Sequence, residues 1–295
     1  MPTNPETGTF MSNAPMLRVA VPNKGILSEA AIAMLKEAGY TTRRDPKDLH
    51  VVDTVNNIEF FYLRPRDIAT YVGSGSLDAG FTGLDLMLDS RSKALTVADL
   101  AFGGSTFRFA GPVGKFKSVN ELAGKRVATA YPGLLEDYFA REGVSDVELV
   151  ALDGAVEVAV RLGVADAVAD VVSTGNTLRQ AGLEIFGPVI LESSAHLIAA
   201  PGSADKATSL LRRMNGVLVA REYVIFDYDC PVHLVEQASA LTPGIESPTI
   251  SPLREQDWVA VRALVKSSET NAKMDALYEL GARAILVSAI HAARI

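Results

Sequence analysis

A short polar turn follows an apolar segment in the middle of the chain, in the sequence ADVVSTGNTL at residues 169–178. The apolar residues 165–172 predict a buried strand, and residues 178–181 predict a short helix. Backbone N–H groups in such a turn form a nest for anions, and a helix N-terminus adds partial positive charge. The turn is therefore a candidate phosphate site, comprising Ser173, Thr174, Gly175, Asn176, Thr177 and Leu178.

Asp170, at the end of the same predicted strand, would repel a bare phosphate. Its carboxylate could instead hold ribose hydroxyls or, through a metal ion, a pyrophosphate. Gly175 lets a ligand approach the backbone closely. An ordinary strand–helix turn capped by Ser or Thr explains the same residues, and spacing alone favours that interpretation.

Other polar residues follow other predicted strands. Lys24, in PNKG, could neutralise a phosphate or lie solvated at the surface. Arg64 and Arg66 flank Pro65, where either could reach a triphosphate or form a surface ion pair. Tyr131 could lie against adenine or pack in the interior.

Two glycine-containing segments suit nucleotide contact at the edge of a cleft. They are VGSG, with Gly73, Ser74 and Gly75, and FTGLD, with Asp85. Asp85 could equally cap the helix that follows it.

A predicted helix over 154–163 begins with acidic residues. Asp153, Gly154 and Glu157 could face a ribose, or the acids could only complement the helix dipole.

Strands and helices alternate from Leu17, which implies parallel sheets covered on both faces. The chain length predicts two such lobes with a cleft between them. We expect residues 16–104 and 194–218 in lobe I and residues 105–193 in lobe II. The predicted strands are 17–21, 58–63, 105–111, 126–130, 147–152 and 165–172.

The order after about residue 204 is a long helix and then βαββαβ, the split βαβ plan of ferredoxin-like folds. Residues 219–295 are therefore predicted to form a separate small domain.

Composition narrows the function classes. The 295 residues are 48% hydrophobic with a net charge of −7, which argues against nucleic-acid binding. The single cysteine, Cys230, cannot form an internal disulfide, and no His/Cys spacing suggests zinc. Residues 1–15 predict a disordered tail rather than a signal peptide, and no apolar segment is long enough for a membrane span. We expect a cytoplasmic protein.

The motifs resemble those of one enzyme family. ADVVSTGNTL is similar to the phosphoribosyl-pyrophosphate loop of ATP phosphoribosyltransferase, the first enzyme of histidine biosynthesis. The resemblance extends over residues 16–295, includes the C-terminal domain of the long form, and looks closest to actinobacterial members. The other similar segments, in order, are RVAVPNKGILSE, FFYLRPRDIATYVGSGSLDAGFTGLD, VATAYP, LDGAVEVAVRLGVADAVADVVSTGNTLR and DYDCP…LTPGIESPTISPL.

The resemblance implies that adenine N1 of ATP displaces pyrophosphate from phosphoribosyl pyrophosphate, with Mg²⁺ neutralising the leaving group. Alignment of the substrates and charge stabilisation suffice for such a reaction, so no Ser-His-Asp signature is needed. The wider phosphoribosyltransferases have two adjacent acids in this loop, whereas Ala169 precedes Asp170 here. Glu157 is our candidate for the second acid, and Lys24 is assigned to the catalytic set.

The resemblance also implies that the C-terminal domain senses histidine and that the chain forms homo-oligomers, dimers and hexamers. Asp229 would bind the ammonium group and Thr249 would accept a hydrogen bond, with backbone groups near Ala284 and Ser288. A dimerisation domain without a ligand is the alternative, with Asp229 as a turn residue.

Two other protein classes share parts of this plan. Prephenate dehydratases join two α/β lobes to an amino-acid-sensing domain, but their Thr-Arg-Phe and Glu-Ser-Arg-Pro signatures are absent here. Solute-binding proteins are two-lobed but normally carry an export signal and need no phosphate loop.

Overall fold

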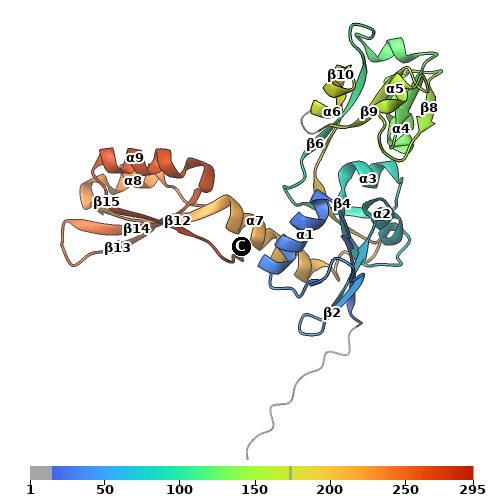
Figure 1. Ribbon diagram of the computed structural model, residues 1–295. Coiled ribbons are helices and arrows are strands. Elements are labelled where there is room, and N and C mark those ends of the chain that lie inside the picture. The colour runs from blue at the N-terminus through green and yellow to red at the C-terminus, as the bar shows by residue number, and fades with distance from the viewer. Residues whose placement is uncertain (1–14, 173–174, 295) are drawn as a thin grey trace, which may run out of the picture.

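The computed structural model describes residues 15–172 and 175–294. Strands within these residues form three sheets, of six, five and four strands. Figure 1 shows two lobes in contact and a third part, orange to red, that projects from them beyond helix α7 (Thr208–Glu222). The α/β fold class predicted from the sequence is confirmed.

The six-stranded sheet of lobe I has the order β2-β3-β1-β4-β11-β5. Helices α1 (Ile26–Glu37) and α7 pack on one face, and α2 (Pro65–Gly73) packs on the other. Because β1, β3 and β4 are parallel, their carboxyl ends share one edge of the sheet. The strands are β1 (Leu17–Pro22), β2 (His50–Asp53), β3 (Ile58–Leu63), β4 (Ala79–Gly83), β5 (Leu95–Asp99) and β11 (Ala195–Ala199).

The five-stranded sheet of lobe II has the order β10-β6-β9-β7-β8. Its largest core cluster surrounds Phe109, whose ring lies 5.6–5.9 Å from those of Tyr138, Phe139 and Phe186. The strands β7, β8 and β9 are parallel, so their carboxyl ends also share one edge. The elements are β6 (Ser105–Pro112), η1 (Val119–Leu122), β7 (Arg126–Thr129), α4 (Pro132–Glu142), β8 (Glu148–Ala151), α5 (Val158–Arg161), β9 (Ala167–Val172), α6 (Asn176–Gln180) and β10 (Leu183–Ser193).

The expectation of parallel sheets is met only in part, because both sheets combine parallel and antiparallel pairs. The chain crosses between the lobes twice, between β5 and β6 and again between β10 and β11. The returning strand β11 inserts between β4 and β5 and runs antiparallel to both, while β6 and β10 pair antiparallel in lobe II. Because the chain leaves lobe I after β5 and returns as β11 at the same edge of the sheet, these two strands run in opposite directions. Antiparallel neighbours of this kind need no crossover helix between them.

Two predicted helices differ in extent from the observed ones. The helix expected over 154–163 is reduced to α5, because Gly154 and Ala155 adopt φ of 95° and 50° and form a turn instead. The helix expected from Leu178 begins two residues earlier, so Asn176 and Thr177 lie within α6.

The four-stranded sheet has the order β13-β14-β12-β15, and the chain order βαββαβ matches the predicted ferredoxin-like plan. Helices α8 and α9 cover one face, over a core that includes Phe226 and Tyr228. Among the described residues, none of the helices combines the length and the apolar character that a membrane span requires. The elements are β12 (Tyr223–Pro231), η2 (Val232–Leu234), α8 (Val235–Leu241), β13 (Thr249–Pro252), β14 (Trp258–Lys266), η3 (Ser267–Glu269), α9 (Thr270–Leu280) and β15 (Arg283–Ala289).

Candidate active site

Side chains that follow the parallel strands of lobe I meet side chains that follow the parallel strands of lobe II. Arg66, after β3, lies over the ring of Tyr131, after β7, at 5.1 Å from the centroid. Asp85, after β4, interacts electrostatically with Asp170 of β9. The carboxyl edges of the two sheets therefore converge, as is usual for ligand sites in α/β folds.

Asp170 lies in a cluster of acids. Burial raises the pKa of its carboxyl, and the charges of Glu157 and Asp85 raise the pKa further. A hydrogen bond from the Val171 N–H to Asp170 Oδ1 (2.8 Å) and the charge of Arg66 act in the opposite direction. Such a pKa, displaced by burial and specific charges at a cleft, is typical of functional sites.

Tyr131 joins this cluster from the N-terminus of α4. Burial raises the pKa of its phenol, as do the charges of Asp85 and Asp170 and a hydrogen bond with Asp85. Its ring also packs edge-on against Phe107, with centroids 5.1 Å apart. Of the two environments considered from the sequence, the Tyr131 ring has the packed one, while its hydroxyl end interacts with Asp85.

Asp85 is held by a residue from the second inter-lobe crossing. The Ser193 hydroxyl donates to Asp85 Oδ1 (2.9 Å), and the Asp85 N–H donates to Ser193 Oγ (3.1 Å). Asp85 is only 7% exposed and is the second residue of α3 (Leu84–Asp89), whose N-cap is Gly83, so Asp85 is not the helix cap considered from the sequence. The structure thus gives Asp85 a partner that sequence reasoning missed.

A cavity of about 600 Å³ opens where the chain crosses between the lobes. Val172, the last residue before the predicted phosphate loop, is part of its lining, together with three titratable residues that sequence reasoning missed, Asp99, Glu192 and His196. The signal for Glu192 and His196 would have been the polar run LESSAH at 191–196. The cavity is lined by Leu84, Asp99, Gly104, Ser105, Thr106, Val172, Glu192, Ser193, Ser194 and His196.

Of the predicted phosphate loop, Ser173 and Thr174 lie outside the described residues. Gly175 has φ of 70°, a left-handed conformation that favours glycine, and stands at the N-cap of α6. Asn176 and Thr177 are exposed, while Leu178 is buried in the lobe II core. The Asn176 Oδ1 accepts a hydrogen bond from Arg179.

Lys24, Arg64, Asp153 and Gly154 are exposed and also follow parallel strands at the converging edges. The turn that carries Lys24 is held by a hydrogen bond from Arg43 Nη2 to the Asn23 carbonyl (2.7 Å).

Gly73, Ser74 and Gly75 lie elsewhere. They end α2 and precede β4, at the amino-terminal edge of the lobe I sheet, opposite the edge that carries Asp85. A Cβ on Gly73 would clash with the Ser92 hydroxyl, and the Ser74 hydroxyl donates to the Tyr71 carbonyl (3.0 Å). This segment closes a helix and is not brought to the other candidate residues.

The predicted ligand residues of the C-terminal domain share one face of its sheet. Strand register places Asp229, Thr249 and Ser288 on the face opposite the helices. Ala284 has φ of 50° at a bulge in β15, which removes backbone groups from regular pairing. Thr249 lines a cavity of about 470 Å³, whose other lining residues are Ile225, Gly244, Ile245, Glu246, Ser247, Arg262, Ala263, Leu264 and Arg294.

Comparison with known proteins matches residues 64–216 to the family ATP phosphoribosyltransferase and residues 220–292 to the HisG C-terminal domain. An ATP phosphoribosyltransferase of Arthrobacter sp. (strain FB24) is 63% identical over 95% of this chain and 100% of its own length. The chain belongs to the ATP phosphoribosyltransferase family. The family predicted from the motifs is thereby confirmed, and the chain is a transferase.

Other members of the ATP phosphoribosyltransferase family support the same assignment. The one from Salinispora tropica is 57% identical over 95% of this chain and all of its own length. The solved structure titled ATP phosphoribosyl transferase (HisG:HisZ) complex from Thermotoga maritima has a TM-score of 0.59 and 29% identity, covering 69% of this chain and 98% of that one. The dehydratase and solute-binding alternatives lose their support.

Proposed function

We propose that this chain condenses ATP with phosphoribosyl pyrophosphate to give phosphoribosyl-ATP and pyrophosphate, the first step of histidine biosynthesis. The bond from adenine N1 to the ribose carbon forms as the bond from that carbon to pyrophosphate breaks, and the electron pair leaves with pyrophosphate. The observation that carries the proposal is the convergence of Asp170, Glu157 and Asp85 at the facing sheet edges, with Asp170 on the strand that leads into the predicted phosphate loop.

The acid cluster suits the charge that this reaction develops. Positive charge spreads over the ribose ring as pyrophosphate departs, and preorganised carboxylates stabilise such charge best in a buried site. Burial and mutual repulsion already raise the pKa of Asp170, so a positive neighbour relieves an unfavourable arrangement. Asp170 and Glu157 would therefore face the ribose, with Tyr131 and Asp85 beside the adenine.

The same carboxylates fit magnesium. No group of three or more His, Cys, Asp or Glu in the part of the chain that the structure describes is arranged to hold a metal ion. Mg²⁺ does not require such a cage, because it keeps several waters and binds one or two carboxylates together with substrate phosphates. Asp170 and Glu157 would supply those carboxylates, and the bound ion would neutralise the pyrophosphate.

The phosphates require positive partners from both lobes. Residues 173–178 would cradle the phosphate of the ribose substrate through backbone N–H groups. Lys24 and Arg64, exposed at the facing edge of lobe I, would neutralise the phosphate chains, while Asp153 and Gly154 would contact the ribose. Gly73, Ser74 and Gly75 are left out of this proposal because of their position.

Histidine would bind on the open face of the C-terminal sheet, with Asp229 receiving its ammonium group and Thr249 accepting a hydrogen bond. The bulge at Ala284, with Ser288 nearby, would offer unpaired backbone groups. Inhibition would require different affinities of histidine for two conformations. We place the active chain in the cytoplasm as a homo-oligomer, a dimer or hexamer.

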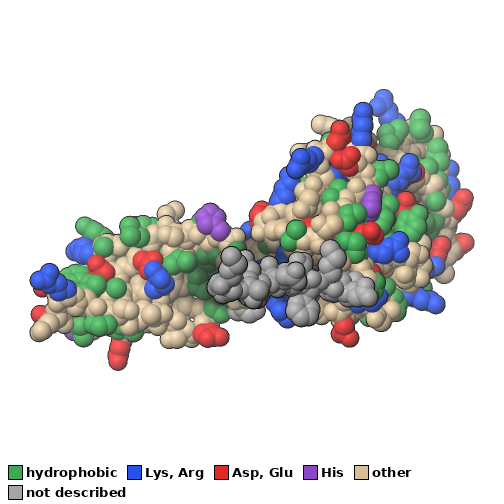
Figure 2. Space-filling view, turned by 90° about the horizontal axis from the view of Figure 1, so that it is seen from below, with side chains coloured by type: hydrophobic (Ala, Val, Ile, Leu, Met, Phe, Trp, Pro, Cys, Tyr) green, Lys and Arg blue, Asp and Glu red, His purple; other side chains and the backbone are tan. Residues whose placement is uncertain are grey.

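Basic and acidic side chains are interspersed on the face shown in Figure 2, and the described residues form no continuous basic surface on that face. This distribution favours small anionic substrates held in a cleft over a nucleic-acid backbone.

The test is a turnover assay with ATP, phosphoribosyl pyrophosphate and magnesium, with pyrophosphatase present to remove a product. Substitution at adenine N1 changes the ultraviolet absorbance, which reports the reaction directly. We expect product only when both substrates and the metal are present. Folded protein that yields no product under these conditions would refute the proposal.

The regulatory part is tested by adding L-histidine to the same assay. We expect suppression of turnover in the wild-type chain and a loss of sensitivity of about tenfold in Thr249→Ala, which removes one hydrogen bond. Ser251→Ala is the matched control, because Ser251 lies on the same strand and face but outside the cavity lining. Equal effects of the two substitutions would contradict the assignment of Thr249.

A further inference from the structure

A side chain of lobe I caps the N-terminus of α4 in lobe II. The first residues of a helix have N–H groups without partners in the helix, and a side chain at the N-cap usually accepts from them. The N-cap residue of α4 is Tyr131, which makes no such side-chain hydrogen bond. Instead the Leu134 N–H donates to Oδ1 of Asp89, the last residue of α3 (3.2 Å).

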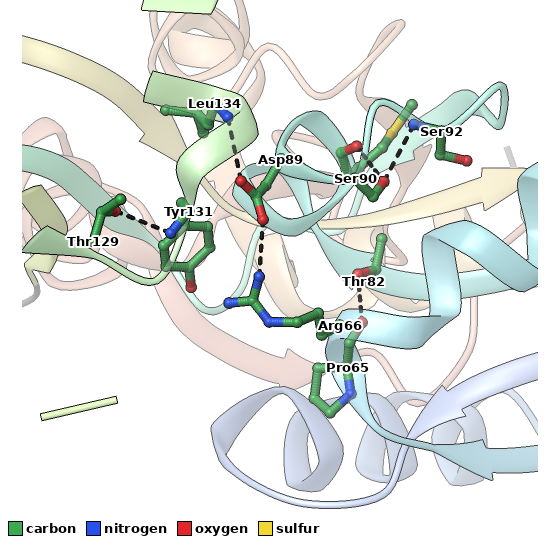
Figure 3. Close-up of polar contacts among 10 residues, drawn as sticks. Pro65, Arg66, Thr82, Asp89, Ser90, Ser92, Thr129, Tyr131 and Leu134 are labelled. Atoms are coloured by element: carbon green, nitrogen blue, oxygen red, sulfur yellow. Dashed lines mark hydrogen bonds and ion pairs between the residues drawn. The ribbon is translucent and has the colours of Figure 1, made fainter. Parts of the chain in front are cut away.

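The second oxygen of the same carboxylate holds the arginine of the candidate site. Arg66 Nη1 donates to Asp89 Oδ2 at 2.8 Å, and the Asp89 side chain is only 9% exposed. Figure 3 shows Arg66 reaching from α2 to Asp89, beside the ring of Tyr131. One carboxylate therefore joins the lobe II helix to the lobe I arginine that lies over Tyr131.

The backbone around this bridge is closely fitted. A Cβ at Gly133 would clash with the Asp89 carbonyl oxygen, so this position accepts only glycine at the observed distance between α3 and α4. Arg91, just beyond α3, pairs with Asp137 (2.6 Å) and Glu136 (2.9 Å) of α4. These outer pairs are half-exposed, and exposed ion pairs contribute little.

We propose that Asp89 is a positioning residue for the transfer reaction, coupling the approach of the two lobes to the placement of Arg66 and Tyr131. When α4 moves away from α3, the Asp89–Leu134 hydrogen bond and the Arg66–Tyr131 contact are lost together. When the lobes approach, the bridge fixes Arg66 and Tyr131 beside Asp85 and Asp170. The expected effect on kcat rests on the proposed function, whereas the expected effect on the Leu134 hydrogen bond does not.

The experiment compares Asp89→Asn and Asp89→Ala with the wild-type chain. Asn keeps an oxygen for the Leu134 N–H but presents no charge to Arg66, whereas Ala removes both contacts. We expect Asn to lower kcat at least tenfold with KM for either substrate changed less than threefold, since geometry rather than binding is lost. We expect amide exchange at Leu134 to accelerate at least tenfold in the Ala variant only.

Arg91→Ala is the matched control, because it removes the exposed pairs of the same contact and a hydrogen bond to the Gly133 carbonyl (3.3 Å) without touching Arg66 or the Leu134 N–H. We expect its kcat within twofold of wild type. The proposal is overturned if Asp89→Ala leaves Leu134 exchange unchanged, or if Arg91→Ala lowers kcat as much as Asp89→Asn. An inactive wild-type chain would refute the proposed function instead, while the exchange measurement would still decide on the bridge.

Discussion

Replacing Asp170 by Asn should separate activity from stability. Asn has the same shape and keeps an oxygen to accept from the Val171 N–H, so the local backbone is retained. The negative charge opposite the developing ribose charge is lost. Removing one preorganised electrostatic group typically lowers kcat by about 10²–10³, which corresponds to about 2.7–4 kcal/mol. We expect a loss of that size in the turnover assay.

The stability of the Asp170→Asn variant should rise although its activity falls. Burial and the charges of Glu157 and Asp85 raise the pKa of Asp170 above 3.8, so its ionised form destabilises the folded state. We therefore expect the variant to unfold at a higher temperature than wild type at pH 7. As the pH falls through the raised pKa towards 3.8, the wild-type carboxyl takes up a proton in the folded state and the difference should disappear.

Asp166→Asn is the matched control, four residues earlier in the chain. Hydrogen bonds from the backbone and side chain of Arg126 lower the pKa of Asp166, so its charge stabilises the folded state above pH 3.8. This variant should be less stable at pH 7, with the loss fading in acid, and its turnover should stay near wild type. The reasoning is refuted if Asp170→Asn keeps turnover within twofold, or if both variants shift stability in the same direction.

Three further predictions concern stability. Phe109→Ala should lower the free energy of unfolding, measured in urea, by about 3–5 kcal/mol, because the ring is fully buried among three other aromatic rings. A loss below about 1 kcal/mol would contradict this packing. Burial acts to raise the pKa of Asp53, but hydrogen bonds from Thr41 and Asn56 outweigh it and lower the pKa. Asp53→Asn should therefore lower the melting temperature above pH 3.8 and converge with wild type in acid, and a pH-independent difference would count against this account. Gly175→Ala should lower the free energy of unfolding, measured by thermal denaturation, by about 1 kcal/mol, because the residue has φ of 70°, which disfavours alanine. An unchanged stability would show that the turn relaxes.

Much of the candidate site could be predicted from the sequence because polar residues directly after apolar runs mark the carboxyl ends of strands. This pattern located Asp170, Tyr131 and Asp85, whose interactions the structure describes. The βαββαβ order could also be predicted, because apolar residues recur with different spacings in helices and in strands.

The contacts between lobes could not be predicted in this way. Asp89 ends a six-residue helix, where a charged residue ordinarily indicates a solvated surface, and its partners Arg66 and Leu134 are 23 and 45 residues away. The same limit applies to β11, a short, fully buried strand without alternation, whose place between β4 and β5 depends on non-local pairing. The placement of Gly73, Ser74 and Gly75 also depends on topology, because a Gly-rich turn looks similar at either edge of a sheet.

The position of β11 has a consequence for how the chain acquires its structure. Strand β5 touches the lobe I sheet only through β11, which is made after the whole of lobe II. During synthesis from the N-terminus, the strands of lobe II can pair as soon as residues 105–193 have emerged, since Ser105 and Ser193 are themselves partners in the β6–β10 ladder. The part of the chain that is translated first is therefore the one whose sheet is completed later, and until residues 195–199 arrive the edge of β4 is open to mispairing.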